Sequence, residues 1–180
     1  QISDPAVNGE KINPDVGGDS FLGAPPVHWL VAWERIASAA DHDIHARLVT
    51  SSAPTGGAPS GSTISIDNSL GTLDITPAVS PSNRAFAWPV VWQRDQAQQD
   101  DIFGARVLFD GSIETAAFPA DNTAVDTQRP SVATPFLTTR YVVAYEEAPA
   151  TLGDIGVRAF EESAMLSEGN ITLIENVATN

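Results

Sequence analysis

Hydrophobic and polar positions alternate with a period of two residues in three separate stretches of this chain. Each stretch has an aromatic residue, a run of small and β-branched residues, a second aromatic four positions later, a polar turn, an Asp-Ile pair and then an arginine. A period of two is that of a β-strand, whose successive side chains point to opposite faces. The pattern therefore predicts three β-hairpins, at residues 28–49, 88–111 and 140–160.

The first strand of each predicted hairpin is apolar on both faces. In the first hairpin, Trp29, Val31 and Trp33 share one face, whereas Leu30 and Ala32 share the other. A strand with two apolar faces must be covered on both sides, so we expect these strands to be central in their sheets and to lie between two other layers. The equivalent residues of the other two hairpins are Trp88, Val90 and Trp92, and Tyr141, Val143 and Tyr145.

Two weaker strands flank each hairpin. A Pro-x-Val element precedes each one, at Pro14, Pro77 and Pro130. Proline is tolerated at the first residue of a strand because that position need not donate an N–H to the ladder, so we expect a short strand to begin at each proline. A fourth strand is expected after each hairpin, at residues 62–66, 112–117 and 170–174.

The chain thus holds three copies of a four-stranded antiparallel unit, without a convincing helical period. An acidic residue followed by asparagine ends each copy, at Asp67, Asp121 and Glu175, and these positions are 54 residues apart. Such a fixed interval indicates true repetition. We expect the asparagine in each case to close an Asx-type turn. The three copies span about residues 12–68, 75–122 and 128–176.

Four-stranded sheets repeated at this interval are typical of β-propeller blades. The copies resemble bacterial β-propeller repeats that carry the elements Pro-x-Val, Val-Val-x-Trp and Asp-Ile-x-x-Arg, and the resemblance extends from about Ile12 to Asn176. It implies an all-β fold of three blades. A pair of β-sandwiches and a β-solenoid are the alternative architectures. The WD dipeptide and the Ser-x-Asp-x-Gly-x-Thr-Trp box of sialidase-type propellers are absent, so the resemblance implies no particular activity.

Three blades are too few to close a ring, because closed propellers have about four to eight. An open stack would leave apolar sheet faces uncovered at both ends. We therefore expect association with other blades, either of the same longer chain or of a second polypeptide. One such arrangement is two copies joined head to tail in a six-bladed ring. The first residue, Gln1, also indicates a processed form or a piece of a longer chain.

Composition excludes several classes of partner. The formal net charge of −14, with a single lysine, gives an acidic surface that repels nucleic acids and anionic lipids. Apolar runs fall short of the ~20 residues of a membrane span, so we expect no membrane insertion. The absence of cysteine excludes disulfides and thiolate zinc sites. The acidic, lysine-poor composition suits a secreted or cell-surface bacterial protein.

The first aromatic of each hairpin is a candidate ligand-binding residue. Trp29, Trp88 and Tyr141 recur at equivalent positions, and aromatic faces stack on sugars. Packing between adjacent sheets is the interpretation we prefer, because these residues share a face of a central strand with a second aromatic.

Calcium is the one candidate cofactor. The polar turn of the middle hairpin gathers Asp95, Asp100 and Asp101, and calcium prefers carboxylate oxygens. A solvated acidic turn is the simpler interpretation, since the equivalent turns hold fewer acids. His42 and His45 are three residues apart on a predicted strand, so they face opposite sides and cannot chelate one metal together.

A polar residue follows the second aromatic of each hairpin, and an arginine follows each Asp-Ile pair. Hairpin geometry brings the two together, so we expect a cross-strand polar pair in each copy, which contributes about 0.2–1 kcal/mol. The expected pairs are Glu34 with Arg47, Gln93 with Arg106, and Glu146 with Arg158.

The sequence carries no catalytic signature, such as a Ser/His/Asp set, a nucleophile elbow or a phosphate-binding glycine loop. Propeller enzymes gather residues at the channel mouth, where the resemblance places Asp15, Ser80 and Ser131, and nothing marks these three as reactive. We therefore expect a non-catalytic binding or protein-interaction platform. The alternatives are a glycan-binding, lectin-like propeller and a fragment of a propeller hydrolase whose catalytic residues lie partly outside this chain.

Overall fold

The computed structural model describes residues 2, 8–19, 27–51, 57–82, 87–96, 99–121, 123–135, 138–147, 154–161, 166–167 and 172–175. Within these ranges every regular element is a β-strand, which confirms the all-β class. The strands are β1 (Glu10–Gly18), β2 (Val27–Ser38), β3 (Asp41–Ser51), β4 (Ala58–Asp67), β5 (Leu73–Val79), β6 (Ala87–Gln96), β7 (Gln99–Leu108), β8 (Ile113–Pro119), β9 (Thr127–Ala133), β10 (Arg140–Glu147), β11 (Asp154–Glu161), β12 (Leu166–Ser167) and β13 (Thr172–Glu175).

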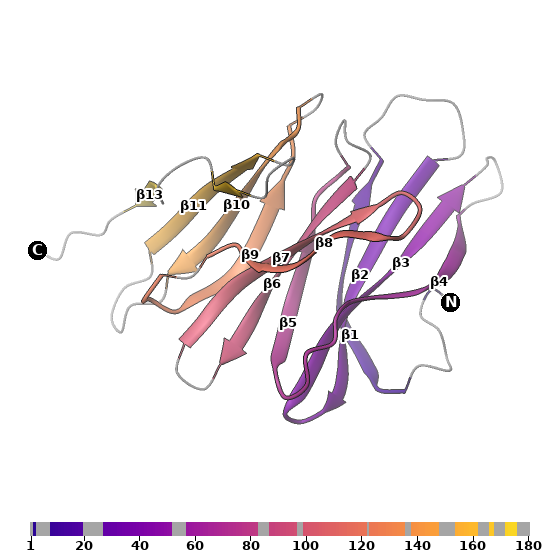
Figure 1. Ribbon diagram of the computed structural model, residues 1–180, viewed down its shortest axis with the longest axis horizontal. Helices are drawn as coiled ribbons and strands as arrows, with labels where there is room; N and C mark the ends of the chain where they lie inside the picture. The colour runs from indigo at the N-terminus through magenta and orange to yellow at the C-terminus, as the bar shows by residue number, and fades with distance from the viewer. Residues whose placement is uncertain are drawn as a thin grey trace, which may run out of the picture.

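The strands form three antiparallel meanders in chain order. Meander 1 is β1–β4, meander 2 is β5–β8, and meander 3 is β9–β11 followed by β12 and β13, which both pair with β11. One parallel residue pair, His42 opposite Leu73, joins β3 to β5. Through this single pair, meanders 1 and 2 are hydrogen-bonded into one eight-stranded sheet. Figure 1 shows the three meanders side by side, with meander 2 between the other two.

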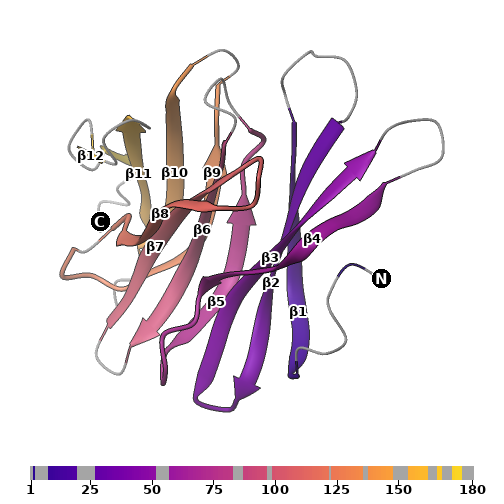
Figure 2. The same ribbon diagram turned by 45° about the vertical axis from the view of Figure 1, so that its right-hand side comes forward.

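The apolar core lies in the two spaces between successive meanders. The first cluster joins residues of β2, β3 and β4 to residues of β5, β6 and β7, and the second joins meander 2 to β10 and β11. Figure 2 shows the sheets facing each other along these spaces. The first cluster is Leu30, Ala32, Ile44, Ala46, Leu48, Ile66, Val79, Trp88, Val90, Trp92, Ala105 and Val107. The second is Val91, Ile102, Ala120, Tyr141, Val143, Tyr145 and Phe160.

Strand β6 confirms that the central strands are apolar on both faces. Trp88, Val90 and Trp92 belong to the cluster shared with meander 1, whereas Val91 belongs to the cluster shared with meander 3. All four side chains are at most 1% exposed. The period-two pattern of the sequence therefore places one set of side chains in each layer, as the pleat of a strand requires.

The proline of each Pro-x-Val element lies inside its strand, so the expectation that a strand begins there is wrong. The residue before each proline has a positive φ, 48° at Asn13, 49° at Thr76 and 50° at Arg129. The register of β1, β5 and β9 shifts at the same place. A β-bulge takes the proline out of the ladder, so its missing N–H leaves no acceptor unsatisfied. Three non-glycine residues in this sparsely populated conformation mark a repeated structural feature.

The turn after β4 is closed by the aspartate and not by the asparagine that follows it. Asp67 Oδ1 accepts hydrogen bonds from Ser69 N at 2.9 Å and from Ser69 Oγ at 2.6 Å. Thr123 Oγ1 donates to Asp121 Oδ2 at 3.0 Å in the equivalent turn after β8. The assignment of an Asx turn to Asn68 is therefore wrong, because the preceding acid makes the bonds. The asparagines that follow Asp121 and Glu175 lie outside the described residues.

The burial of Trp92 predicts a large loss of stability on truncation. Replacing Trp92 by alanine should lower the free energy of unfolding by about 3–5 kcal/mol, because the side chain is fully buried and the cavity would not collapse completely. Chemical denaturation measures the change. As a control, Leu70→Ala should shift it by no more than about 0.5 kcal/mol, because Leu70 is 87% exposed. Equal effects of the two substitutions would contradict the packing described above.

Candidate functional site

The bulge of one meander is hydrogen-bonded to the meander before it. Thr76 N, in the bulge of β5, donates to Glu34 Oε2 on β2 at 3.3 Å. Arg129 N, in the bulge of β9, donates to Gln93 Oε1 on β6 at 3.3 Å. Glu34 and Gln93 hold the same position, directly after the second aromatic of their strands. The bulge thus recurs as a joint between successive meanders, which we call the bulge joint.

Glu34 is 2% exposed and is held by several donors. Asn13 Nδ2 donates to its Oε2 at 2.8 Å, and His42 Nδ1 lies 2.7 Å from its Oε1. A buried carboxylate needs such partners, since the desolvation cost is otherwise uncompensated. The acid that was expected to pair within its own hairpin therefore serves mainly to connect β1, β3 and β5 to β2.

The expected cross-strand pairs with arginine are absent among the described residues, and the strand register explains why. The residue opposite Arg47 is Val31, and the residue opposite Arg158 is Val143. Val31 lies three positions from Glu34, and Val143 lies three positions from Glu146, which puts acid and arginine on opposite faces. In the middle copy Arg106 is opposite Pro89, four positions from Gln93, so about 13 Å of strand separates the two residues. The arginines bind elsewhere: Arg47 donates to Gly61 O, Arg106 pairs with Glu114, and Arg158 donates to Ala120 O.

A second polar connection links the end of one meander to the aromatic residues of the next. Arg94 on β6 forms ion pairs of 2.6 Å with Asp67, at the end of β4, and with Asp74 on β5. Trp92 Nε1 donates to Asp74 Oδ1 at 3.0 Å. Burial raises the pKa of Asp74, whereas the bonds from Arg94 act in the opposite direction. In the next junction Asp121 lies 3.7 Å from Arg158.

The first strands of the three meanders are also bound to one another. Asp15 Oδ2 on β1 accepts a hydrogen bond from Val79 N on β5 at 2.7 Å. Ser80 Oγ, just after β5, lies 2.5 Å from Thr134 Oγ1, just after β9. Gly17 lies so close to Ser80 O that a Cβ atom could not be accommodated there. Asp15 and Ser80, which the sequence placed at a channel mouth, therefore hold structural contacts, and Ser131 is exposed.

The candidate ligand-binding aromatics lie at different depths. Trp88 is 0% exposed and Tyr141 is 1% exposed, whereas Trp29 is half-buried. Trp88 packs on Phe109 with ring centroids 4.3 Å apart, and Tyr141 stacks on Phe160 at 5.1 Å. Trp88 and Tyr141 thus present no ring face to a sugar in this structure. The packing interpretation holds for both of them.

The candidate calcium ligands belong to paired strands and not to a loop. Asp95 on β6 is opposite Asp100 on β7, and the adjacent Asp101 points to the other face. Gln93 Nε2 donates to Asp100 Oδ2 at 3.0 Å, and Gln99 Nε2 donates to Asp101 Oδ1 at 2.8 Å. In the part of the chain that the structure describes, no three acidic or histidine side chains are grouped to hold a metal ion. The structure therefore gives calcium no binding site among these residues.

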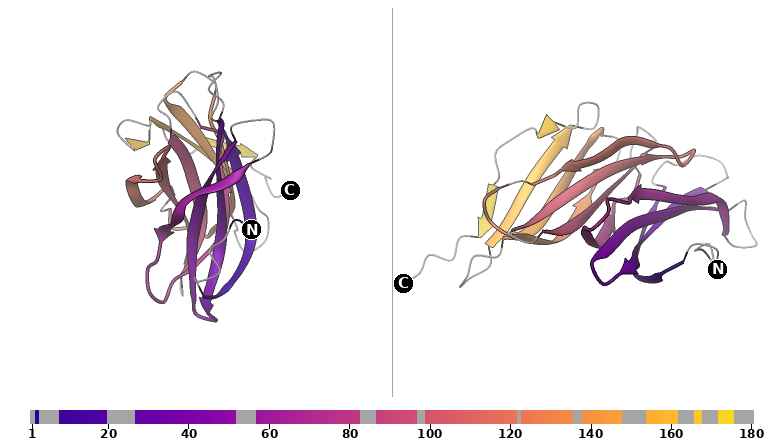
Figure 3. Two further views of the ribbon diagram at one scale, coloured as in Figure 1. Left: turned by 90° about the vertical axis from the view of Figure 1, so that its right-hand side faces the viewer. Right: turned by 60° about the horizontal axis from the view of Figure 1, so that its bottom comes forward.

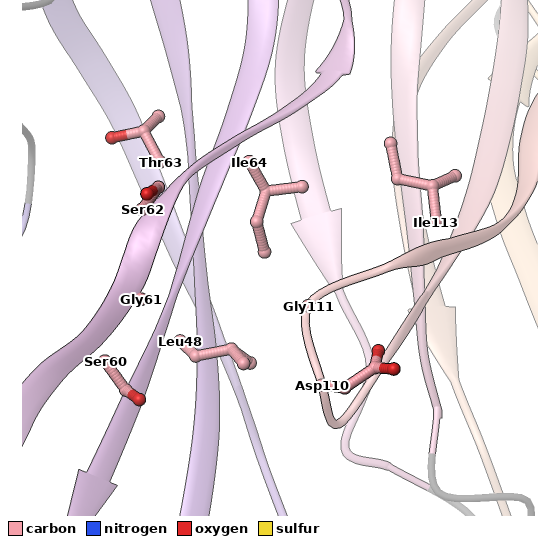
Figure 4. A pocket seen from close by; sticks show the side chains of 9 residues that line it. All are labelled: Leu48, Ser60, Gly61, Ser62, Thr63, Ile64, Asp110, Gly111 and Ile113. Atoms are coloured by element: carbon pink, nitrogen blue, oxygen red, sulfur yellow. The ribbon is translucent and has the colours of Figure 1, made fainter.

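An open groove lies between meanders 1 and 2, on the side where β4 faces the β7–β8 turn (Figure 4). Its volume is about 440 Å³. Hydroxyl groups line β4, a carboxylate lines the turn, and aliphatic side chains form the floor. The lining residues are Leu48, Ser60, Gly61, Ser62, Thr63, Ile64, Asp110, Gly111 and Ile113. Sequence reasoning missed this groove, because it forms only where two meanders face each other.

Comparison with known proteins assigns no family. No protein-family model matches the sequence, and no curated protein matches it. Within the described ranges there is also no helix of the length and apolarity that a bilayer crossing requires.

The acidic strand pair predicts a specific pH dependence. Burial, followed by the neighbouring charges of Asp95 and Asp126, raises the pKa of Asp100 from 3.8 to about 6. Because the folded state then favours the protonated form, stability should fall as the pH rises from about 4 to 6. Asp100→Asn should therefore raise the melting temperature at pH 7, and the gain should shrink below pH 4. Thermal melts between pH 3 and 8 measure it.

Asp110→Asn is the matched control for this prediction. The hydrogen bonds from Ser112 lower the pKa of Asp110, so folding favours its ionised form. Its substitution should lower the melting temperature at pH 7, the opposite direction. A gain of stability on adding calcium chloride that Asp100→Asn removes would instead establish a metal site.

Proposed function

We propose that the three meanders are successive blades of a β-propeller that serves as a non-catalytic binding or protein-interaction platform. The observation that carries this proposal is the bulge joint, which connects meander 2 to meander 1 and meander 3 to meander 2 in the same way. Each first strand also contacts the first strand of the next meander, as β1 does with β5 and β5 does with β9. In a propeller the first strands line a central channel, and this arrangement supports that interpretation.

The contacts of the polar residues support a platform more than an enzyme. Asp15, Ser80, Glu34 and Asp74 are all engaged in bonds between strands or between meanders. A catalytic group must instead be aimed at a site where a reacting atom can lie. Rigid stacked sheets with open edges suit the presentation of loops and grooves to partners. The acidic, lysine-poor composition supports a place in the secreted or cell-surface proteins of a bacterium.

A substrate screen tests the absence of catalysis. The purified chain should show no turnover above blank on chromogenic substrates for glycosidases, esterases, phosphatases and peptidases. Turnover that persists through repurification and is lost in Asp15→Asn or Ser131→Ala would overturn the proposal and favour the propeller hydrolase. Thermal melts of both variants must show that the fold is intact, because Asp15 bonds to Val79 N.

Glycan binding is the second candidate function, and the groove between meanders 1 and 2 favours it. The groove combines the hydroxyls of Ser60 and Ser62, the carboxylate of Asp110 and the aliphatic surface of Ile64 and Ile113. A small number of polar groups over an apolar floor is the composition of many small-molecule sites, and the volume of about 440 Å³ suits a mono- or disaccharide. Such a ligand would bind to the groove and not to the buried Trp88.

A glycan array tests this second function. We expect binding to at least one glycan class, reduced more than tenfold by Ser62→Trp, because an indole at this exposed position would fill the groove. Leu70→Trp adds the same group at an exposed site outside the groove and should leave binding unchanged. Binding that both variants retain, or no binding to any glycan, would exclude the groove as a glycan site.

A further inference from the structure

The outer face of meander 3 repeats a surface that is covered everywhere else in the molecule. Tyr141, Val143 and Tyr145 of β10 pack against meander 2, so the alternate residues Val142 and Ala144 face the other way. Val142 is opposite Ala159 of β11, and Ala144 is opposite Val157. The result is an apolar sheet face with no meander after it in the part of the chain that the structure describes. Figure 3 shows meanders 1 and 3 at opposite ends of the molecule.

The same face of meander 1 is buried by meander 2. There the equivalent residues Leu30, Ala32, Ile44 and Ala46 are all 0% exposed. On meander 3 the corresponding side chains of β10 and β11 are only partly buried. The corresponding residues are Val142, Ala144, Ile155 and Val157. The molecule thus shows directly what covers this face: the first and second strands of a further meander.

The polar part of the joint is also present on this outer face. Glu146 holds the position of Glu34 and Gln93, which both accept the bulge N–H of the next meander. Arg129 Nη1 donates to Glu146 Oε2 at 2.9 Å, just as Asn13 Nδ2 donates to Glu34 Oε2. The Glu146 side chain is still 43% exposed. It therefore has an acceptor position that a further bulge can reach.

The opposite end of the molecule carries the complementary surface. The valine of each Pro-x-Val element packs against the preceding meander, as Val79 and Val132 do. Val16, the equivalent residue of meander 1, is 55% exposed. Trp29, equivalent to the fully buried Trp88, is half-buried. In the part of the chain that the structure describes, no meander precedes meander 1, which presents the face that docks in the other two junctions.

Two buried polar side chains at this end lack hydrogen-bond partners among the described residues. They are Trp33, through Nε1, and His45, through both ring nitrogens. Trp33 is 4% exposed and His45 is 5% exposed. The tryptophan equivalent to Trp33, Trp92, donates to Asp74 on β5 of its own meander. Lys11 holds the position of Asp74 in meander 1, so meander 1 itself supplies no carboxylate acceptor at that position.

We propose that the outer face of meander 3 binds meander 1 of a second copy of this chain, head to tail, through a third bulge joint. In this joint Asn13 N of one copy donates to Glu146 of the other, and Val16 packs on the face formed by Val142 and Ala144.

The interface joins two different surfaces, so it is heterologous, and two copies joined at both ends close a six-bladed ring when the rotation permits. This inference rests on the proposed blade arrangement. Because each copy has a net charge of −14, repulsion opposes the contact at low ionic strength, and salt should strengthen it.

Sedimentation velocity or light scattering on the full chain tests the proposal. We expect a concentration-dependent dimer that strengthens between 20 and 500 mM salt. Val142→Glu, on the outer face of meander 3, and Val16→Glu, on meander 1, should each weaken the dimer at least tenfold. As a control, Val125→Glu changes another exposed valine, in the connection between β8 and β9, and should leave the dimer unchanged.

Mixing the two variants distinguishes a head-to-tail contact from a symmetric one. Val142→Glu retains an intact meander 1, and Val16→Glu retains an intact meander 3, so an equimolar mixture should regain partial association through one intact joint. Thermal melts must show that each monomer remains folded. A chain that stays monomeric at all concentrations, or a dimer that neither variant weakens, would overturn the proposal. Such a result leaves the outcome of the substrate screen, and with it the platform function, unchanged.

Discussion

The structure depends on the burial of both faces of each central strand. Strand β6 carries Trp88 and Trp92 on one face and Val91 on the other, and all three are buried. A single antiparallel sheet covers neither face, so each meander requires a neighbour on both sides. Stacking of meanders is therefore a consequence of the composition of β2, β6 and β10.

The polar contacts fix how the meanders are stacked. Apolar burial has little directional preference, whereas the bulge joint requires one donor and one acceptor at defined positions. Thr76 and Arg129 adopt a conformation that non-glycine residues rarely adopt, and each uses its N–H to bind the preceding meander. The same strained backbone conformation recurs in every meander, directly before the proline of the Pro-x-Val element. The bulge joint combines backbone strain with a hydrogen bond between meanders, so it sets how successive meanders align.

The same contacts support the proposal of a non-catalytic platform. Buried acids such as Glu34 and Asp74 are engaged by Asn13, Arg94 and Trp92, so they are held as structural anions between sheets. One concave surface among the described residues is the groove beside β4, where hydroxyls lie over aliphatic side chains. This distribution of groups favours the proposed binding function over catalysis.

The sequence by itself determined the strands, because their period-two pattern and their Asp-Ile and Pro-x-Val elements are local features that recur at a fixed interval. It also determined that Trp92 would be buried, since a strand apolar on both faces leaves no solvent side. Two local assignments failed. The prolines lie at bulges and not at strand starts, because the sequence does not display the positive φ of the preceding residue, and Asp67 closes the turn assigned to Asn68. Only the tertiary structure decided which partners the polar residues take. Glu34 and Arg47 are near each other in the hairpin but face different layers, and Thr76 meets Glu34 across 42 positions of chain, a pairing that arises when two meanders pack face to face.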